Sequence, residues 1–294
     1  MRYAKSGDVG FIERIKASSF NGLVHSKFNR TVNIQCLETD ELYTVACHDI
    51  DNGPNTLVIG IDQFDDFDLA INEAVFTMDQ KLFISNRLVI SIENANIWES
   101  ELPEYPADPQ VFYRNLSMVK LYIDLHGKNG GVKKSHMPQN PFDVEMSKIL
   151  QERILLLQAE ILKKGMPDVV NSAIKLVGLG PGLTPSGDDF LVGLFTSMNI
   201  PTSPLYGYRK LAEEVVQHAK DLTNDISLIA LKKASYGQVR ESIIHLVQSI
   251  FTGKGEEVTL SLNKVLNIGS SSGTDIALGL YYGLEATIKV GGLK

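Results

Sequence analysis

The segment KLVGLGPGLTPSGDDFLVGL, residues 175–194, joins a turn rich in glycine and proline to the start of an apolar helix. Ser186 precedes the apolar run, and Asp189 follows it three residues later, which is the spacing of a helix-capping pair. We therefore expect a helix with Ser186 as its N-cap and Gly187 as its first residue. The turn before it holds three further candidate binding residues, Gly180, Gly182 and Thr184.

Two nucleotide-binding patterns can be tested against this segment, and both fail. A dinucleotide fingerprint requires glycine three places after Gly180, where this chain has Leu183. A P-loop requires Lys and then Ser or Thr after Gly187, where this chain has Asp188 and Asp189. Two carboxylates at that position would repel a phosphate.

A glycine at the helix start predicts a different kind of site. Gly187 would leave the first backbone amides of the helix open, and such amides bind small anions. Asp188 is not required by the predicted cap, so we expect it to serve function, although an interaction with the helix dipole would also explain it.

A second segment, IGSSSGTDIALGL at residues 268–280, repeats the pattern. Both segments share Ser-Gly-x-Asp, three residues and then Gly-Leu. Gly193 and Gly279 each lie about one turn beyond the aspartate, where glycine costs roughly 1 kcal/mol relative to alanine. A glycine repeated at that cost suggests close helix contact or crowding by a ligand. We expect the two helix starts to face one shared site. For Ser272, a purely structural role as a helix cap is an equally good explanation.

Composition limits the classes of partner. The chain has 294 residues, 44% of them hydrophobic, and its 28 Lys and Arg against 35 Asp and Glu give a formal net charge of −7. An acidic chain of this kind is not expected to bind nucleic acid or anionic membranes. Two cysteines exclude a disulfide framework. With no leader-like segment and no long apolar run, we expect a cytoplasmic protein without a membrane span.

Hydrophobic periodicity divides the chain near residue 105. Residues 1–105 predict a small antiparallel sheet or barrel. A short amphipathic stretch at Phe11, Ile12 and Ile15 precedes its expected strands. Residues 106–294 predict an all-α domain, so the fold class is α+β. Glu101–Pro109 is rich in proline and marks the boundary. The expected strands are 23–28, 31–37, 42–50, 56–61, 74–84 and 87–92. The expected helices are 111–126, 142–165, 168–177, 187–199, 204–220, 226–235, 238–251, 256–267 and 273–289.

Two other segments give weaker signals. Thr223, Asn224 and Ser227 lie in a short polar run that is better explained as a helix N-cap than as a binding site. Residues 127–141 show no apolar period and predict a long mobile loop. Lys128, Lys133, Lys134 and His136 in this loop would make a lid over an anionic substrate, although a solvated loop is the more common case.

The two glycine-rich segments, GLGPGLTPSGDDFLVGL and GSSSGTD-x-x-LGL, resemble the AllH family. This resemblance implies a subunit of the oxamate carbamoyltransferase of anaerobic allantoin and purine breakdown, which works with FdrA-like and AllG-like subunits. That system interconverts oxalurate and phosphate with oxamate and carbamoyl phosphate. The family is wider than this pathway, so the resemblance does not fix the substrate.

The implied substrates are small, polar and anionic, which agrees with a site at two helix starts. We assign Asp188, Asp189 and Asp275 to catalysis. The expected substrate-binding residues are Gly180, Gly182, Thr184, Ser186, Gly187, Thr223, Asn224, Ser227, Ser271, Ser272, Gly273 and Thr274. The aspartates would orient an amide, accept a proton or hold Mg²⁺, and no cofactor is otherwise indicated.

Two alternatives remain open from the sequence. In the first alternative, the chain is a non-catalytic subunit that binds a small carboxylate and regulates or scaffolds its complex. In the second, it is an independent Mg²⁺-dependent enzyme that uses the three aspartates as a carboxylate cluster. Metal titration and activity with and without partner subunits separate these hypotheses.

Overall fold

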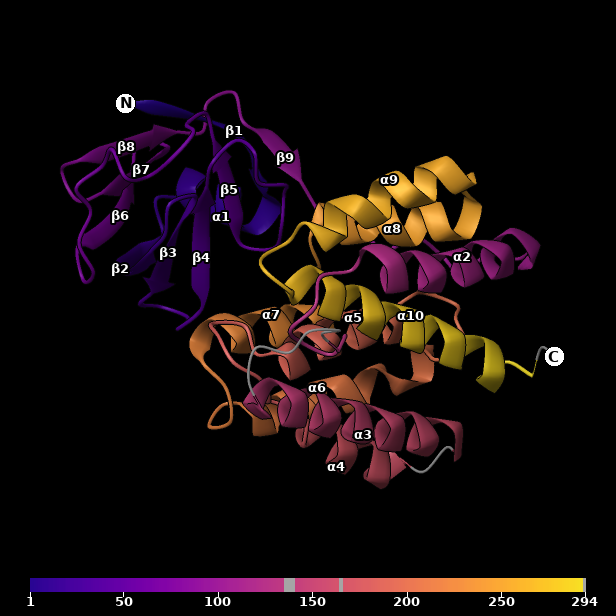
Figure 1. The fold of residues 1–294 in the computed structure, drawn as a ribbon. Helices are drawn as coiled ribbons and strands as arrows, with labels where there is room; N and C mark the ends of the chain where they lie inside the picture. The colour runs from indigo at the N-terminus through magenta and orange to yellow at the C-terminus, as the bar shows by residue number, and fades with distance from the viewer. Residues whose placement is uncertain (135–140, 164–165, 293–294) are drawn as a thin grey trace. The chain divides into compact units, whose positions relative to one another are not determined.

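The computed structural model describes residues 1–134, 141–163 and 166–292, and the chain forms two compact units, Met1–Ser100 and Glu101–Lys294 (Figure 1). The first unit is a β-barrel with an extra strand and the second consists of helices, so the expected α+β class is confirmed. The division falls slightly before the boundary expected near residue 105. The Tyr105 ring packs edge-on against Phe112 and Phe251, so this part of the proline-rich stretch belongs to the helical unit.

The first unit is a closed barrel of eight strands. Hydrogen bonding follows the order β5-β4-β3-β2-β6-β7-β8-β1, and β1 pairs again with β5 to close the ring. The ninth strand, β9, pairs with the second half of β1. The strands are β1 (Arg2–Asp8), β2 (Asn21–Lys27), β3 (Thr31–Cys36), β4 (Leu42–Ala46), β5 (Thr56–Ile59), β6 (Ala74–Met78), β7 (Lys81–Ile84), β8 (Leu88–Ser91) and β9 (Asn96–Trp98).

The barrel departs from the sequence-based expectation in three ways. β1 and β9 were not predicted, and β1 pairs in parallel with β8 and β9, as β4 does with β5. The expected strand 74–84 is a hairpin, because Asp79 and Gln80 adopt φ of 49° and 57° and reverse the chain between β6 and β7. The amphipathic stretch is the helix α1 (Val9–Lys16), which buries Phe11, Ile12 and Ile15.

The second unit contains nine helices within the residues that the structure describes, and each expected helix has a counterpart. They are α2 (Gln110–His126), α3 (Pro141–Lys163), α4 (Met166–Ile174), α5 (Ser186–Met198), α6 (Arg209–Ala219), α7 (Asp225–Ser235), α8 (Glu241–Thr252), α9 (Gly255–Leu266) and α10 (Ser272–Val290). A short 3₁₀ turn, Tyr206–Tyr208, precedes α6. The expected C-cap of α3, Gly165, lies outside the described residues.

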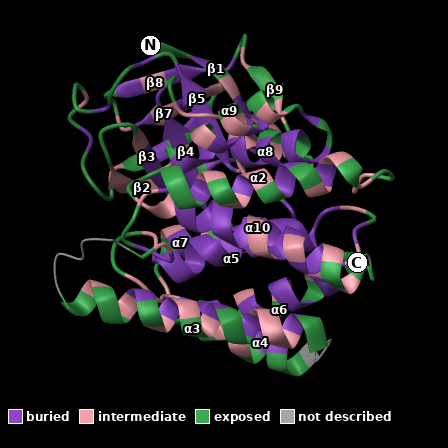
Figure 2. Ribbon diagram, turned by 45° about the vertical axis from the view of Figure 1, so that its right-hand side comes forward, coloured by how far each residue is buried: buried purple, intermediate pink, exposed green. Residues whose placement is uncertain are grey.

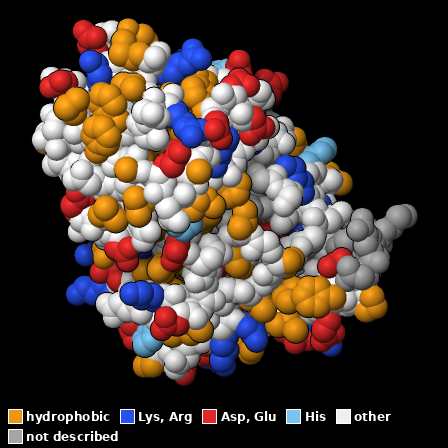
Figure 3. Space-filling view, turned by 90° about the vertical axis from the view of Figure 1, so that its left-hand side faces the viewer, with side chains coloured by type: hydrophobic (Ala, Val, Ile, Leu, Met, Phe, Trp, Pro, Cys, Tyr) orange, Lys and Arg blue, Asp and Glu red, His pale blue; other side chains and the backbone are white. Residues whose placement is uncertain are grey.

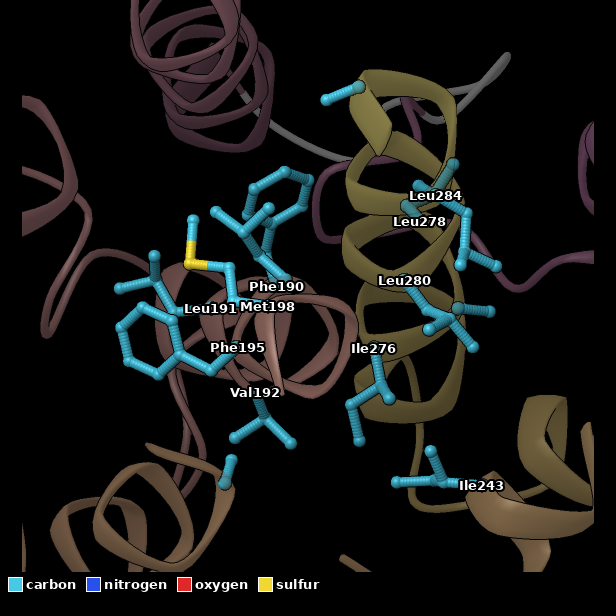
Figure 4. Close-up of a cluster of buried hydrophobic side chains, with 14 of the residues drawn as sticks. Phe190, Leu191, Val192, Phe195, Met198, Ile243, Ile276, Leu278, Leu280 and Leu284 are labelled. Atoms are coloured by element: carbon cyan, nitrogen blue, oxygen red, sulfur yellow. The ribbon is translucent and has the colours of Figure 1, made fainter. Parts of the chain in front are cut away.

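Helix α5 forms the centre of this unit. Every residue from Ser186 to Met198 is buried, whereas α3 exposes much of its surface (Figure 2). A helix that is buried on all sides must be surrounded by other elements, and α10 is its main neighbour. Figure 4 shows the side chain of Val192 on α5 lying near that of Ile276 on α10.

Close contact between α5 and α10 explains the repeated glycines. A Cβ atom at Gly193 would lie 2.0 Å from the Ile276 carbonyl oxygen, and one at Gly279 would lie 1.9 Å from the Phe190 carbonyl oxygen. These two contacts correspond to each other under the alignment of the repeated segments. The predicted close helix contact is therefore confirmed, and it relates the two helices by a local pseudo-symmetry.

The surface carries charges of both signs. On the face drawn in Figure 3, cationic and anionic side chains are interspersed between groups of hydrophobic side chains. Within the described part of the chain, no helix is long and apolar enough to cross a membrane.

Candidate functional site

The start of α5 is not capped in the way that the sequence predicted. Pro185 is the N-cap, and its carbonyl oxygen accepts hydrogen bonds from the amides of Asp188 and Asp189 at 2.9 and 3.1 Å. Ser186 lies within the helix, and its hydroxyl group hydrogen-bonds to Asp275 on α10 instead. The Ser186–Asp189 capping pair was therefore wrong. The same shift occurs on α10, where Ser271 rather than Ser272 holds the N-cap position.

The glycines at the helix starts do not expose open amides. The Gly187 amide donates to Leu179 O at 2.8 Å, and the Gly273 amide donates to Ile268 O at 3.0 Å. A Cβ atom at Gly187 would lie 2.0 Å from Leu176 O, and one at Gly273 would lie 1.9 Å from Val265 O, and both distances are far shorter than a van der Waals contact. Both glycines are required by close packing. The expectation that they present amides to an anion was wrong.

The two helix starts do meet, and they exchange side-chain contacts reciprocally. Ser186 on α5 hydrogen-bonds to Asp275 on α10, and Ser272 on α10 hydrogen-bonds to Asp189 on α5. The Thr184 hydroxyl lies 2.8 Å from the Ser272 hydroxyl and joins the second pair. The expected juxtaposition of the two repeated segments is therefore confirmed, through side chains rather than through amides.

Asp189 and Asp275 are buried acids whose protonation is finely balanced. Burial raises the pKa of both carboxyl groups to about 7. The hydrogen bond from Ser272 lowers the pKa of Asp189, and the nearby charge of Asp275 raises it. The Val132 amide and the hydroxyls of Ser186 and Ser271 lower the pKa of Asp275.

Each of these two acids has one carboxyl oxygen without a hydrogen-bond partner. Asp189 Oδ2 and Asp275 Oδ2 are both buried and unpaired. A buried polar atom without a partner is uncommon and usually marks a missing water, ion or ligand, or a functional group. The pair is therefore equipped to accept a hydrogen bond from a donor or to hold a proton.

Asp188 holds the surrounding chain together. Its Oδ1 accepts from the Gly178 amide at 2.7 Å, and its Oδ2 accepts from the Thr223 hydroxyl. Burial raises the pKa of Asp188, and these hydrogen bonds oppose the rise. The cap of α5 does not require Asp188, but its carboxylate ties the glycine-rich turn to the segment before α7.

The polar run at residues 223–227 closes around the same turn. Asn224 is the N-cap of α7, with its side chain accepting from the amides of Ile226 and Ser227, as expected for a cap. Its Nδ2 also donates to Leu183 O at 2.9 Å, and the Ser227 hydroxyl hydrogen-bonds to Asp188. These residues position the turn.

The turn itself requires two of its glycines for different reasons. Gly180 has φ of 123°, and a Cβ there would lie 2.7 Å from the Ser186 amide nitrogen. Gly182 has φ of 96° with open space around it. Only Gly182 therefore leaves room for another molecule near the backbone.

Residues 127–134 do not form the solvated loop that the sequence predicted. The Lys128 amide donates to Thr274 Oγ1 at 2.8 Å, and the Val132 amide donates to Asp275 Oδ1 at 2.8 Å. Gly131 lies directly over the carboxyl group of Asp275, since a Cβ there would be 2.1 Å from Oδ2. Gly131 and Val132 were not among the predicted site residues, although the adjacent glycines at 130–131 were a signal for such a close approach.

The lysines of this segment bind backbone carbonyls. Lys128 Nζ donates to Gly269 O at 2.9 Å, and Lys133 Nζ donates to Ile123 O at 3.0 Å and Gly127 O at 2.7 Å. Lys134 is exposed. His136, the fourth expected lid residue, lies outside the described residues.

The hypothesis of a three-aspartate magnesium site finds no support in this geometry. Asp188 accepts hydrogen bonds from Gly178 and Thr223, whereas Ser272 bonds to Asp189 and Ser186 bonds to Asp275. Over residues 1–134, 141–163 and 166–292, no group of three His, Cys, Asp or Glu side chains is arranged to hold a metal ion.

Comparison with known proteins matches each unit separately. The family described as "Oxamate carbamoyltransferase subunit AllH" matches residues 176–284, and the "AllH family N-terminal domain" matches residues 3–97. The first match contains both helix starts with Asp189 and Asp275, and the second covers nearly all of the barrel. No solved structure matches the chain.

Proposed function

The chain belongs to the AllH family, and on this premise we propose that it is the subunit of a carbamoyltransferase that interconverts oxalurate and phosphate with oxamate and carbamoyl phosphate. The family description names a subunit, which implies partner subunits. We propose that these are FdrA-like and AllG-like chains, and that the complex serves anaerobic breakdown of allantoin and purines in the cytoplasm.

One observation carries the proposal to particular residues. The reciprocal pairs Ser186–Asp275 and Ser272–Asp189 lie within the region that matches the carbamoyltransferase subunit. Strongly perturbed acids with unpaired oxygens concentrate at functional sites. We therefore place the proton-handling groups of the reaction at Asp189 and Asp275, and we assign Asp188 to positioning.

The chemistry of carbamoyl transfer requires a proton acceptor. When the amide nitrogen of oxamate attacks the carbamoyl carbon, a C–N bond forms, phosphate leaves with the electrons of the C–O bond, and the nitrogen loses a proton. A carboxylate with a pKa near 7 is suited to take that proton and to return it in the reverse direction. Asp189 is the better candidate, because it is 7% exposed whereas Asp275 is fully buried beneath Gly131.

The test is reconstitution of the complex with variants of this chain. Asp189→Asn should lower the rate of oxalurate phosphorolysis by roughly a hundredfold or more, the usual contribution of a general base. Asp221→Asn, which replaces an exposed carboxylate in the same unit, is the matched control and should be fully active. Full activity of both variants would contradict the assignment of Asp189.

Omission of the chain tests the role itself. If the partner subunits reach the full rate without this chain, the chain is not part of the catalytic machinery. The hypothesis of a regulatory or scaffolding subunit would then be favoured. The same assay with a chelator and with added Mg²⁺ tests the metal-dependent alternative.

Tests of anion binding cannot use the helix-start glycines. Gly187→Val and Gly273→Val would each drive a side chain into a backbone carbonyl, so both would disturb packing before they affected any ligand. Variants elsewhere are needed to locate the anion.

A further inference from the structure

A cavity of about 450 Å³ lies in the helical unit, between α2, α3 and α10. Its size falls in the range of about 300–1,000 Å³ that is typical of small-molecule pockets. Leu278 and Tyr282 on α10 line it together with Leu155 on α3. The cavity therefore offers apolar surface on two of the helices that enclose it.

The polar side chains of the cavity carry a positive surplus. Among the described residues, Lys120, Lys133 and Lys134 line it together with one acid, Asp124. Lys120 is already paired with Asp124, at 2.6 Å between Nζ and Oδ2. Two cationic groups thus remain in a chain whose net charge is −7, which favours an anion at this place.

Lys133 is held in place to bind such an anion. Its ammonium group has three hydrogen-bond donors, and Ile123 O and Gly127 O accept two of them. The group is therefore fixed at the end of α2, and among the described residues no acceptor takes its third donor. A fixed donor loses less conformational entropy on binding than a freely rotating lysine does.

The cavity also borders the segment that covers Asp275. Val132 lines the cavity, and its amide donates to Asp275 Oδ1. On the same segment, Val132 O accepts from Gln151 Nε2 at 3.2 Å, and Gln151 is a further lining residue. This contact orients the Gln151 amide, whose oxygen remains suited to accept a hydrogen bond from a ligand N–H.

We infer that this cavity binds a small carboxylate that carries an amide, with the carboxylate at Lys133 and Lys134 and the amide at Gln151. Asp189 does not line the cavity, so this binding site is separate from the proposed proton transfer. The oxamate and oxalurate identity of this ligand rests on the proposed function. The location of the site rests on the cavity, its charge and the fixed ammonium group.

Calorimetric titration of the purified full chain with oxamate tests the inference. Lys133→Gln should weaken binding by about tenfold or more, as expected for loss of a charge-assisted hydrogen bond. Leu155→Trp should abolish binding, because Leu155 is 62% exposed and a larger ring there would fill the cavity without disturbing the core. Leu156→Trp is the matched control, since Leu156 is 56% exposed on the same helix and does not line the cavity.

Several results would overturn the inference. These are no binding of oxamate or oxalurate by the wild-type chain at millimolar concentration, or undiminished binding by Leu155→Trp. Acetate, which lacks the amide, should bind more weakly than oxamate, and equal binding would overturn the assigned role of Gln151. Reconstituted activity distinguishes the two proposals. Undiminished oxamate binding by Leu155→Trp contradicts the cavity alone, whereas cavity binding without any activity of the complex contradicts the proposed function alone.

Discussion

The starts of α5 and α10 carry almost the same sequence, and the structure places them in almost the same surroundings. In each, a glycine packs on a carbonyl oxygen, a serine reaches the aspartate of the other helix, and a later glycine admits the other backbone. Among the polar residues of the repeat they differ at one position. Asp188 on α5 accepts hydrogen bonds from Gly178, Thr223 and Ser227, whereas Thr274 on α10 accepts one from the Lys128 amide.

This difference distinguishes the residues that the two segments share from the residue that contacts different surroundings in each. The shared residues bring the helices together and bury an acid at each start. The differing residue binds whichever segment covers that start, the glycine-rich turn on α5 and residues 128–132 on α10. A repeated pattern can therefore fix a helix pair while leaving each half free to acquire its own cover.

The largest effect is expected where the two halves touch. Gly193→Val or Gly279→Val should destabilise the helical unit by more than about 4 kcal/mol or prevent folding, because each Cβ would meet a carbonyl oxygen of the partner helix. Urea unfolding followed by circular dichroism measures the loss. Gly207→Val is the control, since a Cβ at Gly207 meets nothing within 4 Å. Wild-type stability of either helix variant would contradict the close contact.

A smaller effect should appear as a dependence on pH. Burial raises the pKa of Asp189 and Asp275 from 3.8 to about 7, so their protonated forms favour the folded state. This contribution is complete below about pH 4 and is lost as the pH rises through about 7. Each unit of pKa shift corresponds to about 1.4 kcal/mol, so the loss is at most about 4 kcal/mol per group.

Asparagine resembles the protonated acid and does not ionise, which gives the matching variants. Asp189→Asn and Asp275→Asn should match the wild type only below about pH 4, where the acids are protonated in both states, and exceed its unfolding free energy at pH 8. The double variant should gain less than the sum, because the charge of Asp275 contributes to the raised pKa of Asp189. If the wild type and both variants show the same pH dependence between pH 5 and 8, the acids are not buried as described.

The smallest effect concerns the position at which the halves differ. Asp188→Asn should cost about 1–3 kcal/mol, because an amide nitrogen would then face the Gly178 amide or the Thr223 hydroxyl. Thr274→Val, which removes one acceptor with little change of shape, should cost about 1 kcal/mol. Unfolding midpoints in urea at pH 7 compare the two. Equal losses of unfolding free energy in the two variants would show that the additional hydrogen bonds of Asp188 contribute nothing.

The sequence predicted much of the fold and part of the site. Strong 3.6-residue periods located the helices within a few residues, and the repeat located the pair Gly193 and Gly279. Strand β1 was missed because its alternation is interrupted by Lys5 and Ser6. The capping prediction at Ser186 was wrong because the hydroxyl of this residue finds a partner on α10, and a pattern read along one helix contains no information about a second.

The amino-acid sequence by itself determined the two architectures, their order, the presence of two related helix starts and the need for glycine at their crossing. These are set by local period, turn chemistry and repetition, all of which act over a few residues. Tertiary structure decided which atoms those glycines approach, that Asp189 and Asp275 lose water while Asp188 gains partners, and that residues 127–134 cover one helix start and border a cavity. Hydration and contact depend on chain segments far apart in sequence, so only the folded unit fixes which acids remain without partners.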